Sequence, residues 1–173
     1  DSISTGLSLY GFLDKENVFA QQGLAPSTAL DAEIDGVTLS DKIASFKPKK
    51  VFIMLGTNSV GYADNETLAA SMKELVDKIA GLTKAKIYVI SIPPVTAEAE
   101  ASEENALTLK NITDYNTKLK TVIAGSSATF IDLNSVLSGS DGYFDADYAE
   151  MDGIHFMGTT YEVMLSYLQK QSS

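Results

Sequence analysis

The sequence predicts an α/β fold in three layers, with helices on both faces of a parallel sheet. Short apolar runs rich in β-branched and aromatic residues alternate along the chain with longer segments in which apolar residues recur at helical spacing. The short runs are apolar throughout, which is typical of strands that helices cover on both faces. Because ligands bind at the carboxyl ends of the strands in such sheets, we expect the functional residues in the loops that follow the strands.

Four strands and four helices account for the pattern. The strands are expected where the apolar runs lie, at residues 17–20, 50–55, 86–91 and 128–131. The helices are expected where Leu, Ile, Met and aromatic residues share one helical face, at residues 39–46, 68–79, 112–122 and 161–168. An acidic, Ala-rich stretch at 97–104 lies on the functional edge of the sheet; it is either a solvated loop or helix start, or a lid over the site.

Length and composition indicate one folded domain over residues 1–173. The chain has 173 residues, of which 45% are hydrophobic and 21% are charged, and these are ordinary values for a globular domain. No apolar run approaches the roughly 20 residues that a membrane-spanning helix needs, so we expect no membrane insertion.

Charge and residue usage exclude several classes of partner and cofactor. Acidic residues outnumber basic ones by 23 to 13, which gives a net charge of -10, and every basic residue is a lysine. A chain without Arg lacks the usual bidentate ligand of phosphate, and its negative field repels a polyanion, so we expect no nucleic-acid partner. The absence of Cys excludes thiol nucleophiles and Cys-based metal sites, and one His cannot form a multi-His site, so we expect no metal or organic cofactor.

The single histidine, His155, is the one obvious general base for chemistry near neutral pH. Asp152 precedes it by three residues, and Gly153 between them permits a tight turn that would bring the carboxylate onto the imidazole Nδ1. Nε2 would then face outward as a base, which is the supporting half of a Ser-His-Asp triad. The alternative interpretation of this pair, taken alone, is an ordinary surface loop.

The nucleophile must be a Ser or Thr, because the chain has no Cys. The segment around Ser8 begins like a G-x-S-x-G nucleophile elbow, but Tyr10 stands where the second Gly is required and no strand precedes it, so we exclude Ser8. The first residues also fail as a D-x-S-x-S metal-adhesion loop, because Ile3 occupies a position that needs a hydroxyl ligand.

Two positions after predicted strands are candidates for an oxyanion hole. Asn58 follows the strand expected at 50–55, and Gly56 before it allows a sharp turn, so the Asn58 amide could donate to a developing oxyanion. The alternative for Asn58 is a turn former or a helix cap. Gly23 follows the strand expected at 17–20; the alternative is a loop glycine before a helix that Ser27 would cap.

The combination of these features is more specific than its parts. Four short blocks occur in a fixed order along the chain: Asp1-Ser2 with Gly6, then Gly23, then Gly56-Thr57-Asn58, then Asp152-Gly153-Ile154-His155. In this order, and in an α/β chain, the blocks resemble those of the SGNH or GDSL family of serine esterases and acylhydrolases. The resemblance spans the chain from its first residue to its last predicted helix.

The resemblance implies a flavodoxin-like parallel sheet and a role for each block. Ser2 would be the nucleophile, and Asp152 and His155 would complete the triad. The oxyanion hole would be formed by the Ser2 N–H, the Gly23 N–H and the Asn58 side chain. Two departures from the family pattern are that no Gly precedes the first Asp and that the third block ends in Ser59, where the family usually has Asp.

The family pattern also implies a strand directly before the first block, in the middle of the sheet. We therefore expect the natural protein to carry an apolar strand ending in Gly ahead of Asp1, so that the first strand of the sheet is missing from this sequence. A secretion signal ahead of that strand, and a secreted or cell-surface bacterial protein, would be compatible with this expectation.

The function predicted from these features is a serine esterase or acylhydrolase. It would cleave carboxylic esters, with short acyl or acetyl groups on small molecules or glycans, through an acyl-enzyme. The alternative is a catalytically silent carbohydrate-binding or adhesion module on the same fold, since a fold alone does not fix function. A flavodoxin-type or receiver-type regulator is disfavoured, because the sequence shows neither a phosphate-binding loop nor an acidic pocket.

Overall fold

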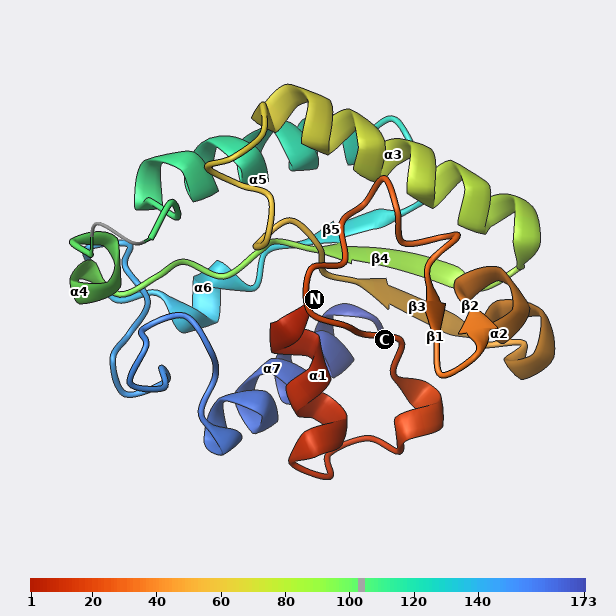
Figure 1. Ribbon diagram of the computed structural model, residues 1–173, viewed down its shortest axis with the longest axis horizontal. Helices are drawn as coiled ribbons and strands as arrows, with labels where there is room; N and C mark the ends of the chain where they lie inside the picture. The colour runs from red at the N-terminus through yellow and green to blue at the C-terminus, as the bar shows by residue number, and fades with distance from the viewer. Residues whose placement is uncertain (103–104) are drawn as a thin grey trace.

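A parallel sheet forms the middle layer of the computed structural model, which describes residues 1–102 and 105–173 (Figure 1). Its strands are β3 (Lys50–Ile53), β4 (Lys86–Ile90) and β5 (Thr129–Ile131), with β4 in the centre. Val51 of β3 lies beside Ile87, and Ile90 lies beside Ile131. These strands fall within three of the predicted runs, and the α/β prediction is confirmed.

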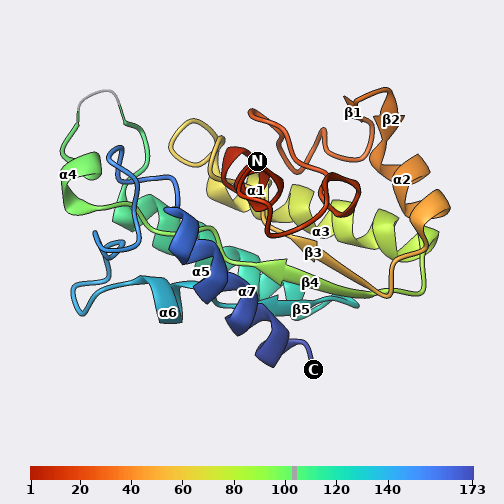
Figure 2. The same ribbon diagram turned by 90° about the horizontal axis from the view of Figure 1, so that it is seen from below.

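Helices cover both faces of this sheet, as two perpendicular views show (Figures 1 and 2). One face carries α3 (Asn65–Leu82) and α5 (Leu109–Ile123), and the other carries α1 (Ser2–Leu9) and α7 (Gly158–Gln171). The remaining helices of the described residues are α2 (Leu39–Phe46) and the short α4 (Ala97–Glu100) and α6 (Asn134–Leu137). No helix in the described part of the chain is long and apolar enough to cross a membrane.

The central strand β4 is buried on both faces of the sheet from Ile87 to Ile90, which explains why this stretch is apolar. Ile87 and Val89 pack into the apolar cluster formed with α3 and α5, whereas Tyr88 and Ile90 pack into the cluster formed with α1 and α7. Successive side chains of a strand point to opposite faces, so every position from Ile87 to Ile90 is buried, and only Lys86 at the start of the strand is exposed.

Side-chain caps start the helices that bring the functional segments together. Asp64 caps α3 and Thr108 caps α5, each by accepting the backbone N–H three residues on. Asp1 caps α1 in the same way, with Oδ1 3.1 Å from the Ser4 nitrogen. The sequence pattern did not predict α1, although Ile3 and Leu7 one turn apart give it an apolar face.

The strand predicted at residues 17–20 is wrong. A 3₁₀ helix, η1 (Lys15–Asn17), occupies its start, and the Val18 carbonyl accepts a hydrogen bond from the Lys42 Nζ at 3.1 Å. The run is short, and local backbone carbonyls and the Lys42 side chain, rather than a neighbouring strand, bond to its backbone at Asn17 and Val18. A hairpin that the apolar runs do not predict is formed by β1 (Glu33–Ile34) and β2 (Val37–Thr38).

The hairpin turn has a recognisable signal that could have predicted it. Asp35 and Gly36 both have positive φ angles, of 53° and 77°, as the favoured two-residue hairpin turn requires. An Asp-Gly pair between short apolar segments is the usual sequence mark of such a turn.

The edge of β3 that faces away from β4 has no strand beside it among the described residues. A cavity of about 750 Å³ lies along β3, between apolar side chains of both helical layers that include Ile43, Leu75, Ile79 and Leu168. A strand ahead of Asp1 remains a prediction.

Leu119 tests the contact between α5 and α3. Its side chain is fully buried, so Leu119→Ala should lower the free energy of unfolding by about 2–5 kcal/mol through lost burial and a residual cavity. Thr113→Ala on the exposed side of the same helix should change it by less than about 0.5 kcal/mol. Urea denaturation measures both variants, and equal losses would contradict the assigned packing.

Candidate active site

Ser2 is the first residue of α1, directly after the capping Asp1. The first N–H groups of a helix have no partner within the helix, so the Ser2 side chain sits where backbone donors and the positive end of the helix dipole converge. The position of α1 is fixed by Tyr161 of α7, whose hydroxyl donates to the Ile3 carbonyl at 2.7 Å. Gly6 lies so close to the same hydroxyl that a methyl group there would overlap it.

Asp152 and His155 form one compact turn before α7. The Asp152 Oδ1 accepts the backbone N–H groups of Ile154 and His155, both at 2.9 Å, and its Oδ2 lies 2.6 Å from the His155 Nδ1. Desolvation raises the pKa of Asp152, but the hydrogen bonds from His155 and Ile154 outweigh it and leave that pKa below its usual value. The carboxylate therefore stays ionised beside the imidazole.

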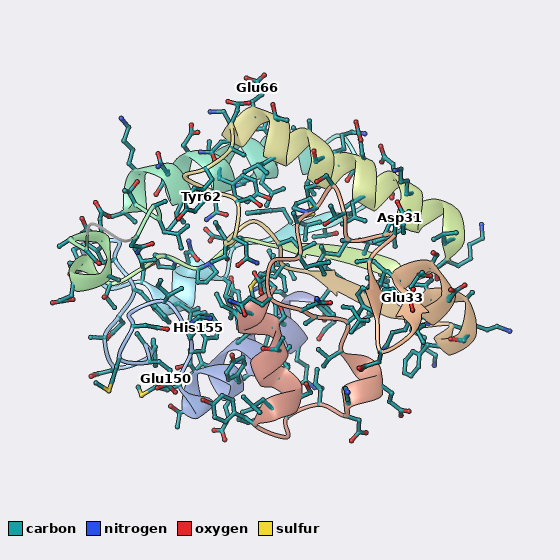
Figure 3. The ribbon with its side chains drawn as sticks, in the orientation of Figure 1. Asp31, Glu33, Tyr62, Glu66, Glu150 and His155 are labelled. Atoms are coloured by element: carbon teal, nitrogen blue, oxygen red, sulfur yellow. The ribbon has the colours of Figure 1, made fainter. Side chains whose placement is uncertain are left out.

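The second ring nitrogen of His155, Nε2, contacts Ser2 at the start of α1. Its Nε2 lies 2.9 Å from the Ser2 Oγ, so hydrogen-bonding contacts link Ser2, His155 and Asp152 in a row. Figure 3 labels His155 on the loop that leads into α7, beside the start of α1. The His155 side chain is 40% exposed, so a solvent-borne ligand can reach it.

Neighbouring elements hold this loop on two sides. The Glu150 N–H donates to the His155 carbonyl at 2.8 Å, and the Tyr10 hydroxyl donates to the Glu150 carboxylate at 3.1 Å. On the other side the Thr96 N–H donates to the Gly153 carbonyl at 3.0 Å. Sequence reasoning missed Thr96, because its part depends on a contact between residues far apart in the chain.

Gly153 has a close neighbour on α4. Its φ is +69°, and a methyl group there would overlap the Thr96 hydroxyl and crowd Ala99, which is buried. For residues 97–102 the structure therefore agrees with the interpretation as a helix start. Residues 103 and 104, which complete the stretch considered as a lid, lie outside the described residues.

Asn58 lies in the turn after β3, and its amide nitrogen is buried. Within the described residues this Nδ2 has no hydrogen-bond partner. Buried donors are normally satisfied in folded proteins, so this amide is available to a hydrogen-bond acceptor that enters the turn. The turn itself is closed by the Ser59 and Val60 N–H groups, which donate to the Gly56 carbonyl at 2.8 and 2.9 Å.

Gly23 is the predicted site residue that the structure ties least to the others. It is exposed, with a φ of +79° and open space around its Cα, and no hydrogen bond joins it to Ser2, Asn58 or His155 among the described residues. Contrary to the prediction, Gly23 does not follow a strand, because residues 17–20 do not form one. Its place in an oxyanion hole remains a prediction.

Ser8, which the sequence excludes as a nucleophile, lies within α1. Its hydroxyl donates to the Thr5 carbonyl at 3.1 Å. Over residues 1–102 and 105–173, no group of three or more His, Asp or Glu side chains is arranged to hold a metal ion.

Comparison with solved structures identifies the fold. A GDSL-like lipase from Bacteroides thetaiotaomicron is 18% identical, with a TM-score of 0.61 over 75% of this chain and 64% of its own. A lipase/acylhydrolase from Enterococcus faecalis is 19% identical, with a TM-score of 0.60 over 77% of this chain and 65% of its own. A catalytic mutant of an acetylxylan esterase from Geobacillus stearothermophilus is 20% identical, with a TM-score of 0.54 over 75% of this chain and 62% of its own.

In each case this chain spans less than two thirds of the other protein's length. No curated protein matches the sequence. The model of the GDSL-like lipase/acylhydrolase family, however, matches residues 1–163, which is nearly the whole chain. Because the family model matches this much of the sequence, the chain belongs to the GDSL-like lipase/acylhydrolase family.

Proposed function

We propose that this protein is a serine esterase that hydrolyses carboxylic esters through an acyl-enzyme. The observation that carries the proposal is the row of contacts from the Ser2 Oγ to the His155 Nε2 at 2.9 Å and from the His155 Nδ1 to the Asp152 Oδ2 at 2.6 Å. A nucleophile, a base and a group that orients the base, each within hydrogen-bond reach of the next, are what this chemistry requires.

In the first half of the reaction, the His155 Nε2 takes the proton of the Ser2 hydroxyl as the Ser2 Oγ attacks the ester carbonyl. The tetrahedral intermediate collapses when His155 returns that proton to the leaving alcohol, which gives an acyl-enzyme. Water then repeats the sequence and releases the acid. Asp152 keeps the proton on Nδ1, so that Nε2 is free to act as the base, and stabilises the imidazolium that forms.

The oxyanion would be stabilised by donors from three segments. The Ser2 N–H lies at the start of α1, where the helix dipole favours negative charge. The buried Asn58 Nδ2 is available because it has no other partner among the described residues. The Gly23 N–H is the third donor in this proposal. Such donors act most strongly when they are fixed before the reaction starts.

Short acyl esters, including acetyl groups on carbohydrates, are the proposed substrates. The acetylxylan esterase among the structural relatives supports an acetylated sugar as one candidate. The net charge of -10 disfavours anionic ligands and anionic lipid surfaces. Acetylated xylo-oligosaccharides and p-nitrophenyl esters of increasing chain length are therefore the substrates to compare first.

Ser2 can be tested directly as the nucleophile. Ser2→Ala should lower kcat for p-nitrophenyl acetate by roughly 10⁶-fold, the order of loss when a triad loses its serine. A fluorophosphonate should label the wild-type chain on the peptide that contains Ser2, as read by mass spectrometry. Ser8→Ala, on the same helix, should keep both activity and labelling. An unlabelled wild-type chain without esterase activity would instead support the silent binding module.

Asn58 tests the oxyanion hole. Asn58→Ala should lower kcat by about 10²–10³-fold with little change in melting temperature, because it removes a donor to the transition state. Steady-state kinetics with p-nitrophenyl acetate measure the loss. The exposed Asn17→Ala serves as the matched control and should behave like the wild type. Unchanged turnover in Asn58→Ala would remove this residue from the site.

Gly153 tests whether the base needs its close contact with α4. Gly153→Ala and Gly142→Ala both place a side chain on a left-handed backbone, which costs roughly 1–2 kcal/mol. Only at Gly153 does the new methyl group overlap a neighbour, since the nearest atom at Gly142 is 3.6 Å away. We expect kcat to fall at least about tenfold in Gly153→Ala alone. Equal kcat values for the two variants would show that the contact with Thr96 is dispensable.

A further inference from the structure

We propose that Tyr115 is a positioning residue for the reaction, whose buried hydroxyl holds the turn that carries Asn58. This inference rests on the proposed esterase function and adds to it a residue that no block of the sequence contains. Tyr115 lies in the middle of α5, on the opposite face of the sheet from α1 and α7. It therefore acts on the reaction only through the turn it contacts.

The hydroxyl of Tyr115 reaches the end of β3. It donates to the Leu55 carbonyl at 3.0 Å, and both residues are buried, with exposed fractions of 0% and 5%. Burial raises the pKa of Tyr115, so the hydroxyl keeps its proton and remains a donor. Leu55 precedes Asn58 by three residues, which makes this bond the anchor at the entrance of the turn.

The ring of Tyr115 packs against the next residue, Gly56. A methyl group on Gly56 would lie 2.6 Å from the ring Cε1, and the φ of Gly56 is +137°. Only glycine therefore fits between the backbone and the ring at this point. The hydrogen bond and the ring contact together fix the backbone at two successive residues before Asn58.

The far side of the turn is closed by different contacts. The Gly56 carbonyl accepts the N–H groups of Ser59 and Val60, and the Val60 side chain is fully buried. Asn58 thus lies on a short arch with both ends fixed. No hydrogen bond to the side chain of Asn58 is found among the described residues, so its backbone must set the direction of its amide.

Removing the Tyr115 hydroxyl would leave the Leu55 carbonyl buried without its donor. A buried polar group without a partner is unfavourable, and the backbone shifts to relieve it. A displacement of the Asn58 amide is enough to weaken its bond to the oxyanion, because a misplacement of about 1 Å can cost roughly 10²-fold in rate. The substrate, which Tyr115 does not touch, should bind as before.

Tyr88, in the central strand β4, provides a matched control. It is also a buried tyrosine whose hydroxyl donates to a backbone carbonyl, that of Ser172 at 3.2 Å, near the end of the chain. Its replacement by Phe removes the same chemical group at a place unconnected with the turn.

The experiment is a double-mutant cycle with p-nitrophenyl acetate on the wild type, Tyr115→Phe, Asn58→Ala and the double variant. We expect Tyr115→Phe to lower kcat roughly ten- to hundredfold with KM within about twofold. The same change in the Asn58→Ala background should have almost no further effect, because the group it positions is gone. Tyr88→Phe should leave kcat within about twofold of the wild type even where it lowers the melting temperature.

Two results would overturn the proposal: a kcat for Tyr115→Phe that matches that of Tyr88→Phe, or losses that simply multiply in the double variant. If Tyr115→Phe does not fold by circular dichroism, Gly56→Ala disturbs the same contact from the other side and takes its place in the cycle, with the same two criteria. Hydrolysis that persists in Ser2→Ala would instead overturn the proposed serine esterase function, so the two failures are distinct.

Discussion

The packing of α1 on α7 is the contact on which the arrangement of the candidate site depends. Residues 2 and 155 are far apart in the chain, and they meet because the Tyr161 hydroxyl is bonded to the Ile3 carbonyl and Gly6 admits the tyrosine ring. The ring lies among Tyr10, Phe12 and Phe156, all in tilted contact with it. Aromatic packing around Tyr161 therefore helps to set the distance between Ser2 and His155.

The same construction recurs at the other two segments of the site. Gly6, Gly56 and Gly153 each lie in a functional segment, and each faces a side chain from another element so closely that a methyl group would overlap or crowd it. The partners are Tyr161, Tyr115 and Thr96, and each of them also makes a hydrogen bond with the carbonyl of the segment it touches. Each of these segments is thereby joined to another element by both a close side-chain contact and a hydrogen bond.

The sequence predicts the parts of this molecule that follow from local pattern. Apolar runs predict β3, β4 and β5, and the central strand β4 is buried on both faces. The spacing of Asp152, Gly153 and His155 predicts the tight turn, because Gly153 permits it and the carboxylate can then reach the imidazole. The run at 17–20 misleads, since β-branched and aromatic composition alone cannot show whether a neighbouring strand exists. Local sequence patterns could not identify Tyr115, Tyr161 and Thr96. Each of these residues matters through a contact with a residue distant in the chain, which no local pattern encodes.

The two carboxylate oxygens of Asp152 make different contacts. Oδ1 accepts two backbone N–H groups and so shapes the turn, whereas Oδ2 lies beside the imidazole Nδ1, where an ionised carboxylate favours the ring form with its proton on Nδ1. An asparagine here could keep its oxygen on the backbone, but its amide would then face Nδ1 and turn the ring's proton toward Ser2. The turn would keep its shape, whereas the His155 Nε2 would become a hydrogen-bond donor to the Ser2 Oγ. In this one side chain, the oxygen that shapes the turn and the oxygen that orients the imidazole are therefore different atoms.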